Sequence, residues 1–427
     1  MQYPALVSCR ASAGLELLDG LTLTTPLDPT SGRVQYRPSL RAFAVVGATD
    51  SLVRGVALSI YPLLMFRAWG DALVVSQMYF AVGVLSLLTG LTVPLVMRYL
   101  ARRWLYSAGA MLFVLSAAIG MVGGKLITVA LLCHGIATAT VFVCFNAYVL
   151  DNVAKSELSR FESLRIIYGG VGWTLGPALG VWLLGYWHGA PFVIVGMAAA
   201  TMLAAFWWLR VATSHTSSQT ERVGGKPLAY LGRFLHQPRL LAGWLFAVLR
   251  SCGWWFYTVY VGIYALQNGL GEHVGGIASS LANAGLFMAP LMLRWMQHHS
   301  VRHAVRTGFA ASGTLFILAA LLSPFPLAMV AVLVAASFFL VLLDVCAGLP
   351  FLMSVKPSQR TEMSAVYSSF RDVSGILAPA VAWLVLQFSP VAGVFAAGGA
   401  MLLLAWGIAG SIHPHLGQTG GQLQRPR

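Results

Sequence analysis

The sequence predicts an all-α membrane protein with about twelve transmembrane helices, arranged as two six-helix pseudo-repeats. Composition is the first observation behind this prediction: of 427 residues, 58% are hydrophobic and 9% are charged, whereas soluble domains carry about a quarter charged residues. The second is a set of uncharged stretches, such as those between Arg165 and Arg210 and between Arg306 and Asp344. Each is longer than the roughly 20 residues that cross a bilayer as a helix. The third is an internal repeat.

The repeat is clearest in the segment 94–98, which recurs as 290–294 at an offset of 290 − 94 = 196 residues. Weaker echoes follow at offsets of 200, 201 and 202 residues, and they pair Arg160-Phe161-Glu162 with Arg360-Thr361-Glu362, Gly70-Asp71 with Gly271-Glu272, and Gly176-Pro177 with Ala378-Pro379. These matches keep one order and nearly one offset, which indicates two similar halves. In a membrane chain, such halves are typical of transporters that bind their solute between them.

Division of the uncharged stretches at glycine, proline and charged residues gives the expected helices. They lie near 42–65, 74–97, 105–124, 126–150, 166–187, 190–209, 240–266, 274–293, 305–323, 326–354, 366–388 and 391–411. The corresponding domains are a cytosolic tail (1–40), an N-terminal six-helix bundle (41–210), a cytosolic linker (211–239), a C-terminal six-helix bundle (240–411) and a second cytosolic tail (412–427).

The formal net charge of +14 is distributed unevenly between the loops. Lysine and arginine gather in every second loop, for example around Arg98, Arg233 and Arg302, while the intervening loops carry few. Because this bias sets the orientation of membrane helices, we expect an inner-membrane protein with both termini in the cytoplasm. The basic charge is thus assigned to topology and not to nucleic acid. The expected partners are the lipid bilayer, protons and a small-molecule substrate, and we expect a monomer.

Three motif regions carry a resemblance to a known family. The loop after the second expected helix has Pro94, Arg98, Ala101, Arg102 and Arg103 at the places of a Gly-x-x-x-Asp-Arg-x-Gly-Arg-Arg pattern. In this loop and in its six-plus-six organisation, the chain resembles the major facilitator superfamily. The two final arginines agree with the pattern, whereas Arg98 replaces its aspartate and both glycines are lost. The resemblance implies a gating or conformational role for Arg98, Arg102 and Arg103.

The fifth expected helix matches better. Its residues 172–180 fit the pattern Gly-x-x-x-Gly-Pro-x-x-Gly, which the family shows in proton-coupled exporters. Glycines four residues apart allow close helix packing, and a proline bends the helix, so Gly172, Gly176 and Pro177 are candidates for conformational change or for packing alone. The preceding stretch 161–173 also resembles sugar–proton importers of the same superfamily. The exporter motif favours export over import.

Charged residues inside expected helices are the candidate functional groups, because a charge at the bilayer centre costs about 2.5–3.5 kcal/mol on insertion scales. Asp50 and Arg54 lie one turn apart on the first helix, and Asp344 lies deep in the tenth. We expect Asp50 and Asp344 to carry coupling protons, with Arg54 at the substrate site. The alternative is that Asp50 and Arg54 form a structural pair, and that Asp344 pairs with an arginine of another helix.

The seventh expected helix contains an unusual aromatic run that begins after Arg250. Arg250, Trp254 and Tyr257 share one helical face, and a cation beside stacked rings suits a planar organic anion or an amphiphile. The alternative is an aromatic interface belt. Asn146 on the fourth helix is a further candidate for substrate binding. Because the Asp50–Arg54 pair has no visible counterpart in the seventh helix, we expect the scaffold to repeat but not the chemistry.

Further charges near the cytoplasmic ends are expected to form a gate. Arg371 and Asp372 begin the eleventh helix and could pair with one another or contact substrate. Arg165, near the start of the fifth helix, could serve the same gate with Glu162 and Asp151 as its partners.

The sequence contains no P-loop, no His-Glu-x-x-His and no Gly-x-Ser-x-Gly motif, so we expect neither ATP-driven transport nor an enzyme. Its five cysteines have no metal-site spacing, and no cofactor or metal is expected. The predicted function is a secondary active transporter that moves a small organic solute by alternating access, proton-coupled and in the direction of export. The alternatives are a proton-coupled importer of a sugar, organic anion or siderophore-like compound, and a non-transporting membrane assembly factor or sensor.

Overall fold

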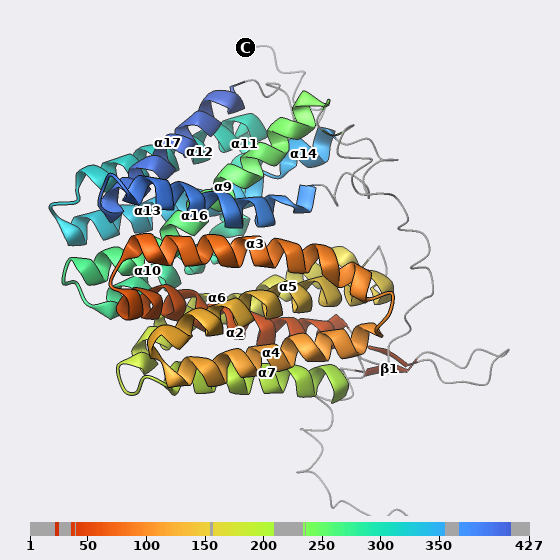
Figure 1. The fold of residues 1–427 in the computed structure, drawn as a ribbon. Coiled ribbons are helices and arrows are strands. Elements are labelled where there is room, and N and C mark those ends of the chain that lie inside the picture. Colours follow the sequence, from red (N-terminus) through yellow and green to blue (C-terminus); the bar gives the residue numbers. More distant parts are fainter. Residues whose placement is uncertain are drawn as a thin grey trace, which may run out of the picture.

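A computed structural model describes residues 22–24, 36–38, 40–153, 157–208, 234, 236–354 and 367–410. Long helices form two bundles that lie against each other (Figure 1). Most of the expected tails and linker lie outside the described residues. Within the first tail, β1 (Thr22–Thr24) pairs antiparallel with β2 (Tyr36–Pro38), a short sheet that the sequence did not predict.

The N-terminal half contains the first six of the expected helices, in the lower part of Figure 1. Its elements are α2 (Leu40–Trp69), α3 (Ala72–Val96), α4 (Arg102–Val122), the 3-10 turn η1 (Gly124–Leu126), α5 (Ile127–Asn152), α6 (Leu158–Leu184) and α7 (Ala190–Trp208).

The C-terminal half repeats this order with two interruptions. Its elements are α9 (Pro238–Gln267), α10 (Glu272–Ala284), the 3-10 turn η4 (Gly285–Met288), α11 (Ala289–His299), α12 (Val301–Leu321), α13 (Pro326–Cys346), α14 (Leu349–Ser354), α16 (Phe370–Leu386) and α17 (Val391–Ala409). The eighth expected helix is divided into α10, η4 and α11 because Pro290 cannot donate a backbone hydrogen bond and its ring crowds the preceding turn. The tenth is divided at Ala347 and Gly348, because Pro350 lacks the backbone N–H that would bond to the carbonyl four residues earlier.

Ten helical segments of the described chain are long and apolar enough to cross a membrane. The two long helices outside this set are α9 and α16. Arg250 and several tryptophans and tyrosines lower the hydropathy of α9, and α16 spans only 17 residues. Together these segments give six helices per half, which confirms the predicted class of a helical, multi-pass membrane protein.

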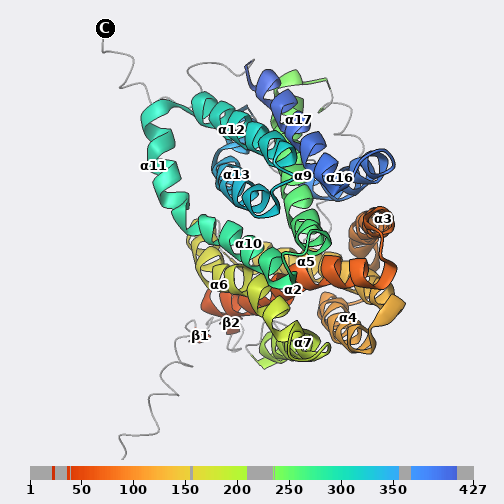
Figure 2. The ribbon, with the colours of Figure 1, turned by 90° about the vertical axis from the view of Figure 1, so that its left-hand side faces the viewer.

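The bundle has two ends, which we name after residues in their turns. The Gly70 end holds the α2–α3 and α9–α10 turns, where Gly70 (φ 69°) and Gly271 (φ 85°) adopt left-handed backbone conformations. This places the repeated pair Gly70-Asp71 and Gly271-Glu272 at equivalent turns of the two halves. The Arg98 end holds the α3–α4 connection. Figure 2 views the molecule from the Gly70 end, with the N-terminal half below the C-terminal half.

Within the N-terminal half, glycines allow α2 and α6 to pack backbone to backbone. A Cβ atom on Gly55 would lie 2.2 Å from the carbonyl oxygen of Gly172, and one on Gly176 would lie 2.5 Å from the carbonyl carbon of Gly55. Both distances are shorter than a van der Waals contact, so a larger residue at either position would force the helices apart. This close packing fixes the position of the α2 charges relative to α6.

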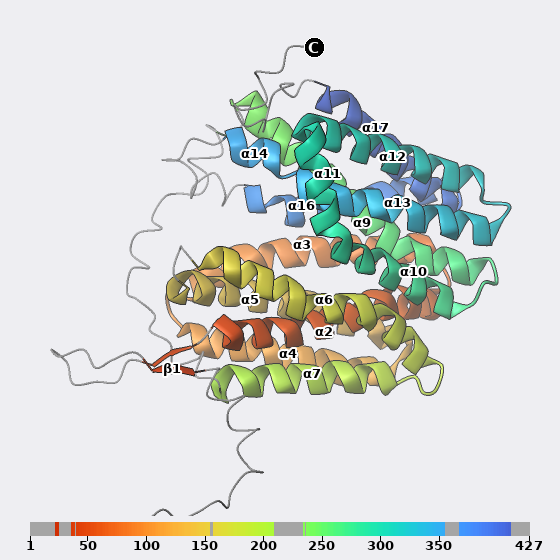
Figure 3. The ribbon, with the colours of Figure 1, turned by 180° about the vertical axis from the view of Figure 1, so that it is seen from behind.

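The two halves interlock near the Gly70 end. Arg67 of α2 forms an ion pair with Glu272 of α10. The buried hydroxyl groups of Ser76 on α3 and Tyr260 on α9 lie 2.6 Å apart and share a hydrogen bond. Midway along the bundle, a Cβ on Gly83 of α3 would lie 2.3 Å from the carbonyl oxygen of Gly375 on α16. Toward the Arg98 end, α9 rises away from α2 (Figures 1 and 3).

Candidate functional site

The first charged cluster lies on the N-terminal half. One turn of α2 separates Asp50 from Arg54, and the Arg54 guanidinium lies 2.5 Å from the Asp50 carboxylate. The same guanidinium stands 5.2 Å from the ring centroid of Trp173 on α6. The side chains of Arg54 and Asp50 remain 25% and 17% exposed, so the pair is shielded but not sealed.

The second charged cluster lies on the C-terminal half and joins three helices. Arg250 of α9 lies 3.2 Å from Asp344 of α13, and the indole N–H of Trp254 donates to the other Asp344 oxygen at 3.0 Å. The Arg250 guanidinium stands 5.3 Å from the ring centroid of Phe370 on α16. The side chains of Arg250 and Asp344 are 13% and 29% exposed. The structure therefore brings together Arg250, Trp254 and Asp344.

These two clusters are alike in composition. Each arginine lies on the first helix of its half, pairs with a carboxylate, and contacts an aromatic ring of the fifth helix of that half. The two arginines are not in the same register, because Arg54 lies 70 − 54 = 16 residues before the Gly70 turn and Arg250 lies 271 − 250 = 21 residues before the Gly271 turn. The carboxylate comes from the same helix in one half and from α13 in the other. An arginine–carboxylate pair on the first helix is thus common to both halves, contrary to our expectation that the chemistry does not repeat.

Arg371 lies between the halves. Its guanidinium belongs to α16 of the C-terminal half and stands 4.9 Å from the ring centroid of Phe142 on α5 of the N-terminal half. It also stands 5.6 Å from Phe370, the ring that Arg250 contacts from 5.3 Å. Arg54, Arg165 and Arg250 all lie within electrostatic reach of Arg371. The residue is exposed, and no carboxylate of the described residues lies within ion-pairing distance of its guanidinium.

Several other predicted site residues lie around this centre. Asn146 is half-buried on α5, one turn beyond Phe142. Asp372 follows Arg371 and is also half-buried. The Arg165 side chain passes beside Gly47 of α2. Glu162 belongs to α6, but its side chain lies outside the described residues.

Tyr257 does not join the clusters. It is 1% exposed, and its hydroxyl group donates to the backbone carbonyl of Ala278 on α10 at 2.7 Å. Its ring packs edge-on to Trp254, with the two ring centroids 6.1 Å apart. Trp254 and Tyr257 share a helical face but have different contacts: Trp254 donates to Asp344, and Tyr257 links α9 to α10.

In this conformation, the contacts that basic residues make at the Arg98 end are with other residues of the N-terminal half. Arg102 forms a 2.6 Å ion pair with Asp151 and links the start of α4 to the end of α5. Arg103 lies 6.0 Å from the ring centroid of Trp104, and Arg98 is exposed. Asp151, which we expect as a partner of Arg165, is paired with Arg102 in this conformation.

The Gly-Pro motif of α6 also has a packing role. Gly172 and Gly176 face the backbone of α2, as described above. One residue after Pro177, the backbone N–H of Ala178 donates to the hydroxyl group of Ser280 on α10 at 2.9 Å. A Cβ on Gly276 of α10 would lie 3.0 Å from the carbonyl oxygen of Pro177. The motif therefore brings α6 against both its own half and the other half.

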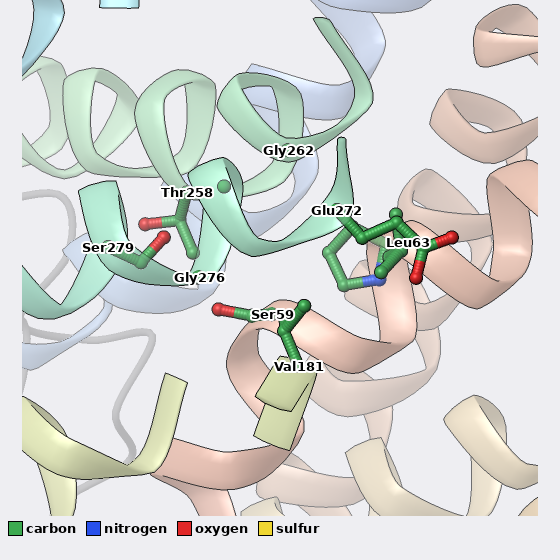
Figure 4. Close-up of a pocket in the computed structure, with 10 residues that line it drawn as sticks. Ser59, Leu63, Val181, Thr258, Gly262, Glu272, Gly276 and Ser279 are labelled. Carbon is green, nitrogen blue, oxygen red and sulfur yellow. The ribbon is translucent and has the colours of Figure 1, made fainter. Parts of the chain in front are cut away.

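A small cavity lies at the same interface. It is lined by residues of α2, α6, α9 and α10, including Ser59, Val181, Thr258, Glu272 and Ser279. Figure 4 shows Ser59 of α2 facing Gly276 of α10 across it. The polar groups here belong to both halves, and Glu272 is the residue that pairs with Arg67.

Sequence reasoning missed Trp173, Phe142 and Phe370, the rings beneath the arginines, and the interhalf contacts of Arg67, Ser76, Tyr260 and Glu272. Aromatic residues are too frequent in this chain for a ring contact to be identified by type alone.

Comparisons with known proteins agree with this architecture. The family model of the Major Facilitator Superfamily matches residues 43–379. No curated protein matches the chain in sequence. Among solved structures, a mutant of the nucleoside transporter NupG superposes with a TM-score of 0.70 at 13% identity, covering 87% of this chain and 99% of that one. A POT family transporter in complex with a thioalcohol-conjugated peptide gives 0.71 at 11% identity and covers 89% and 96%.

A second peptide transporter of the POT type, in complex with sulfate, gives a TM-score of 0.69 at 14% identity and covers 92% of this chain and 97% of that one. At these identities the likeness establishes the fold, and the family is established by the sequence match over most of the chain. The family match indicates a transporter and not an enzyme. The chain belongs to the major facilitator superfamily of membrane transporters.

Proposed function

We propose that this protein is a secondary active transporter that moves a small organic solute across the inner membrane by alternating access, with coupling protons carried by Asp50 and Asp344. One observation carries the proposal. On the first helix of each half, an arginine within the membrane is held by a carboxylate in a partly exposed ion pair.

Charged groups in the bilayer interior lose their hydration, which costs free energy. A charged pair that is kept there in spite of this cost is therefore a candidate for a functional role. A proton that binds Asp50 or Asp344 neutralises the carboxylate and releases the partner arginine. Conversely, a solute that attracts the arginine weakens its hold on the carboxylate and favours protonation. Each pair thus links proton binding to solute binding. The partial exposure of these side chains supports access by water and protons.

Alternating access is supported by the position of the interhalf contacts. Arg67–Glu272 and Ser76–Tyr260 hold the halves together at the Gly70 end, while α9 diverges from α2 toward the Arg98 end (Figure 3). Basic loops occupy the Arg98 end, which we therefore assign to the cytoplasm. This arrangement corresponds to a transporter closed on the outer side. Rocking of the halves would break the Gly70-end contacts and form new ones at the Arg98 end.

The structural neighbours are a nucleoside transporter and a POT family transporter bound to a peptide conjugate, which supports a small organic solute as cargo. The exporter motif on α6 is fully used in packing against α2 and α10. The proposal therefore extends to either direction of transport, set by the gradients of solute and protons.

Proteoliposomes that contain a trapped pH-sensitive dye test the coupling. A panel of organic anions, organic cations and sugars is added one compound at a time, and the solute-induced change in internal pH is recorded. We expect at least one compound to move protons in the wild-type protein and none to do so in Asp50→Asn/Asp344→Asn. The control is Asp71→Asn, an exposed helix cap whose acceptor oxygen is retained. Solute-driven proton movement that survives the double substitution would reject proton coupling through these carboxylates.

A further inference from the structure

We infer that the solute is an organic anion, and that Arg371 is the group that first binds its negatively charged oxygens. This inference rests on the proposed function, because it concerns the site between the two halves. It adds to that proposal the charge of the cargo and the residue that selects it.

The first reason is an excess of positive charge. Arg54 and Arg250 each have a carboxylate partner, at 2.5 Å and 3.2 Å. Arg371 is within electrostatic reach of both arginines and of Arg165, and also of the Asp372 and Asp344 carboxylates. Within the described residues, however, no carboxylate lies at ion-pairing distance of its guanidinium. An arginine near other arginines is stabilised when an anion joins it. Arg371 therefore carries a positive charge that no ion pair of the described residues neutralises.

The second reason is the way Arg371 is held. Its guanidinium lies against the rings of Phe142 and Phe370, 4.9 and 5.6 Å from their centroids. An arginine that stacks on a ring uses the flat face of its guanidinium and leaves the N–H groups at the edge free to donate. These N–H groups form a planar fork that matches the two oxygens of a carboxylate or the oxygens of a phosphate. The aromatic support orients the fork without neutralising it.

The third reason is the position of Arg371 between the halves. The side chain comes from α16 and rests on Phe142 of α5, so an anion bound there would contact both moving bodies. Arg54 and Trp173 approach from the N-terminal half, and Arg250 and Trp254 from the C-terminal half. The rings offer apolar contact for the remainder of the solute. A neutral or cationic solute would leave Arg371 unpaired, and a cation would in addition be repelled.

Binding to the purified full-length protein in lipid nanodiscs tests the inference. The probes share one ring and differ in charge: benzoate and phenyl phosphate as oxyanions, benzyl alcohol as the neutral match and benzylamine as the cation. The readouts are tryptophan fluorescence and the shift in unfolding temperature. Arg371→Gln removes the charge and Arg371→Lys keeps it. The matched control is Arg306→Gln, because Arg306 of α12 also lies over a ring, 5.3 Å from the centroid of Trp406, outside the site.

We expect at least one oxyanion to bind the wild-type protein and Arg306→Gln at least tenfold more tightly than the alcohol or the amine. Arg371→Gln should lose this preference, and Arg371→Lys should keep part of it. Binding that favours the alcohol or the amine, equal oxyanion binding in Arg371→Gln, or no binding of either oxyanion would each overturn the inference. The assay needs no proton gradient, so anion binding without coupled flux would contradict only the proposed coupling. Coupled flux of cations or sugars alone would contradict only the anion site.

Discussion

The hydrogen bond between Ser76 and Tyr260 should stabilise the conformation in which the Gly70 end is closed. Its two hydroxyl oxygens lie 2.6 Å apart, and Ser76 and Tyr260 are 0% and 2% exposed. Tyr260→Phe removes this bond across the halves and leaves the ring in place. Ser76 keeps its hydrogen bond to the carbonyl of Ala72 at 2.8 Å, so no donor is stranded. The closed state of Tyr260→Phe therefore loses only the hydrogen bond between the halves.

Hydrogen bonds between membrane helices contribute on average about 0.6 and at most about 1.7 kcal/mol. This corresponds to a decrease of roughly three- to eighteenfold in the population of the closed state relative to the open one. Spin labels are attached at Tyr186→Cys and Phe388→Cys, which replace residues that are 72% and 87% exposed at the Gly70 end. The distribution of distances between the two labels, measured by double electron–electron resonance, reports that population. We expect a larger share of long distances in Tyr260→Phe.

The matched control is Tyr264→Phe, one turn further along α9. Its hydroxyl group donates to the carbonyl of Ser323 at 2.9 Å, a bond that lies within the C-terminal half. Tyr264→Phe should lower the unfolding temperature without changing the distance distribution. An identical distribution in Tyr260→Phe and Tyr264→Phe would refute the reasoning that interhalf bonds at this end set the conformational equilibrium.

Three further predictions concern other contacts. Arg67→Glu should open the Gly70 end by the same spin-label measurement, and the exchange Arg67→Glu/Glu272→Arg should restore closure; the effect is about 0.2–1 kcal/mol because these side chains are 39% and 21% exposed. Gly55→Ala should prevent correct folding, because its methyl carbon would lie 2.2 Å from the carbonyl oxygen of Gly172. The measurement is loss of monodisperse protein in size-exclusion chromatography. The control Gly90→Ala should fold normally, because no atom lies within 4 Å of its added methyl carbon. Arg102→Gln should lower the stability of the protein by about 0.2–1 kcal/mol in thermal unfolding, because it breaks an ion pair whose Asp151 side chain is 26% exposed; a shift in the interhalf distances instead would assign Arg102 to the gate.

The helices were predictable because hydropathy and charge report on the bilayer, and each uncharged stretch has to cross it. The Asp50–Arg54 pair was also predictable, because residues four apart on a helix share a face. The pairs of Asp344 with Arg250 and of Arg371 with Phe142 were not. They join helices that are distant in sequence, and many arginines and rings could have met Asp344 or Arg371 equally well. The breaks at Pro290 and Pro350 were visible as prolines, but a proline alone does not say whether a helix bends or ends.

Protonation of Asp50 and protonation of Asp344 should affect the packing of the helices differently. Asp50 and its arginine belong to one helix, so protonation of Asp50 frees Arg54 without releasing any contact between helices. Asp344 joins α13 to α9 through both Arg250 and Trp254, so its protonation loosens the helix that diverges from α2 toward the Arg98 end. We therefore expect Asp344→Asn to broaden the interhalf distance distribution and Asp50→Asn to leave it unchanged while altering solute affinity. If both substitutions changed the distances equally, Arg54 and Arg250 would share one conformational role, and the difference in their carboxylate partners would have no mechanistic meaning.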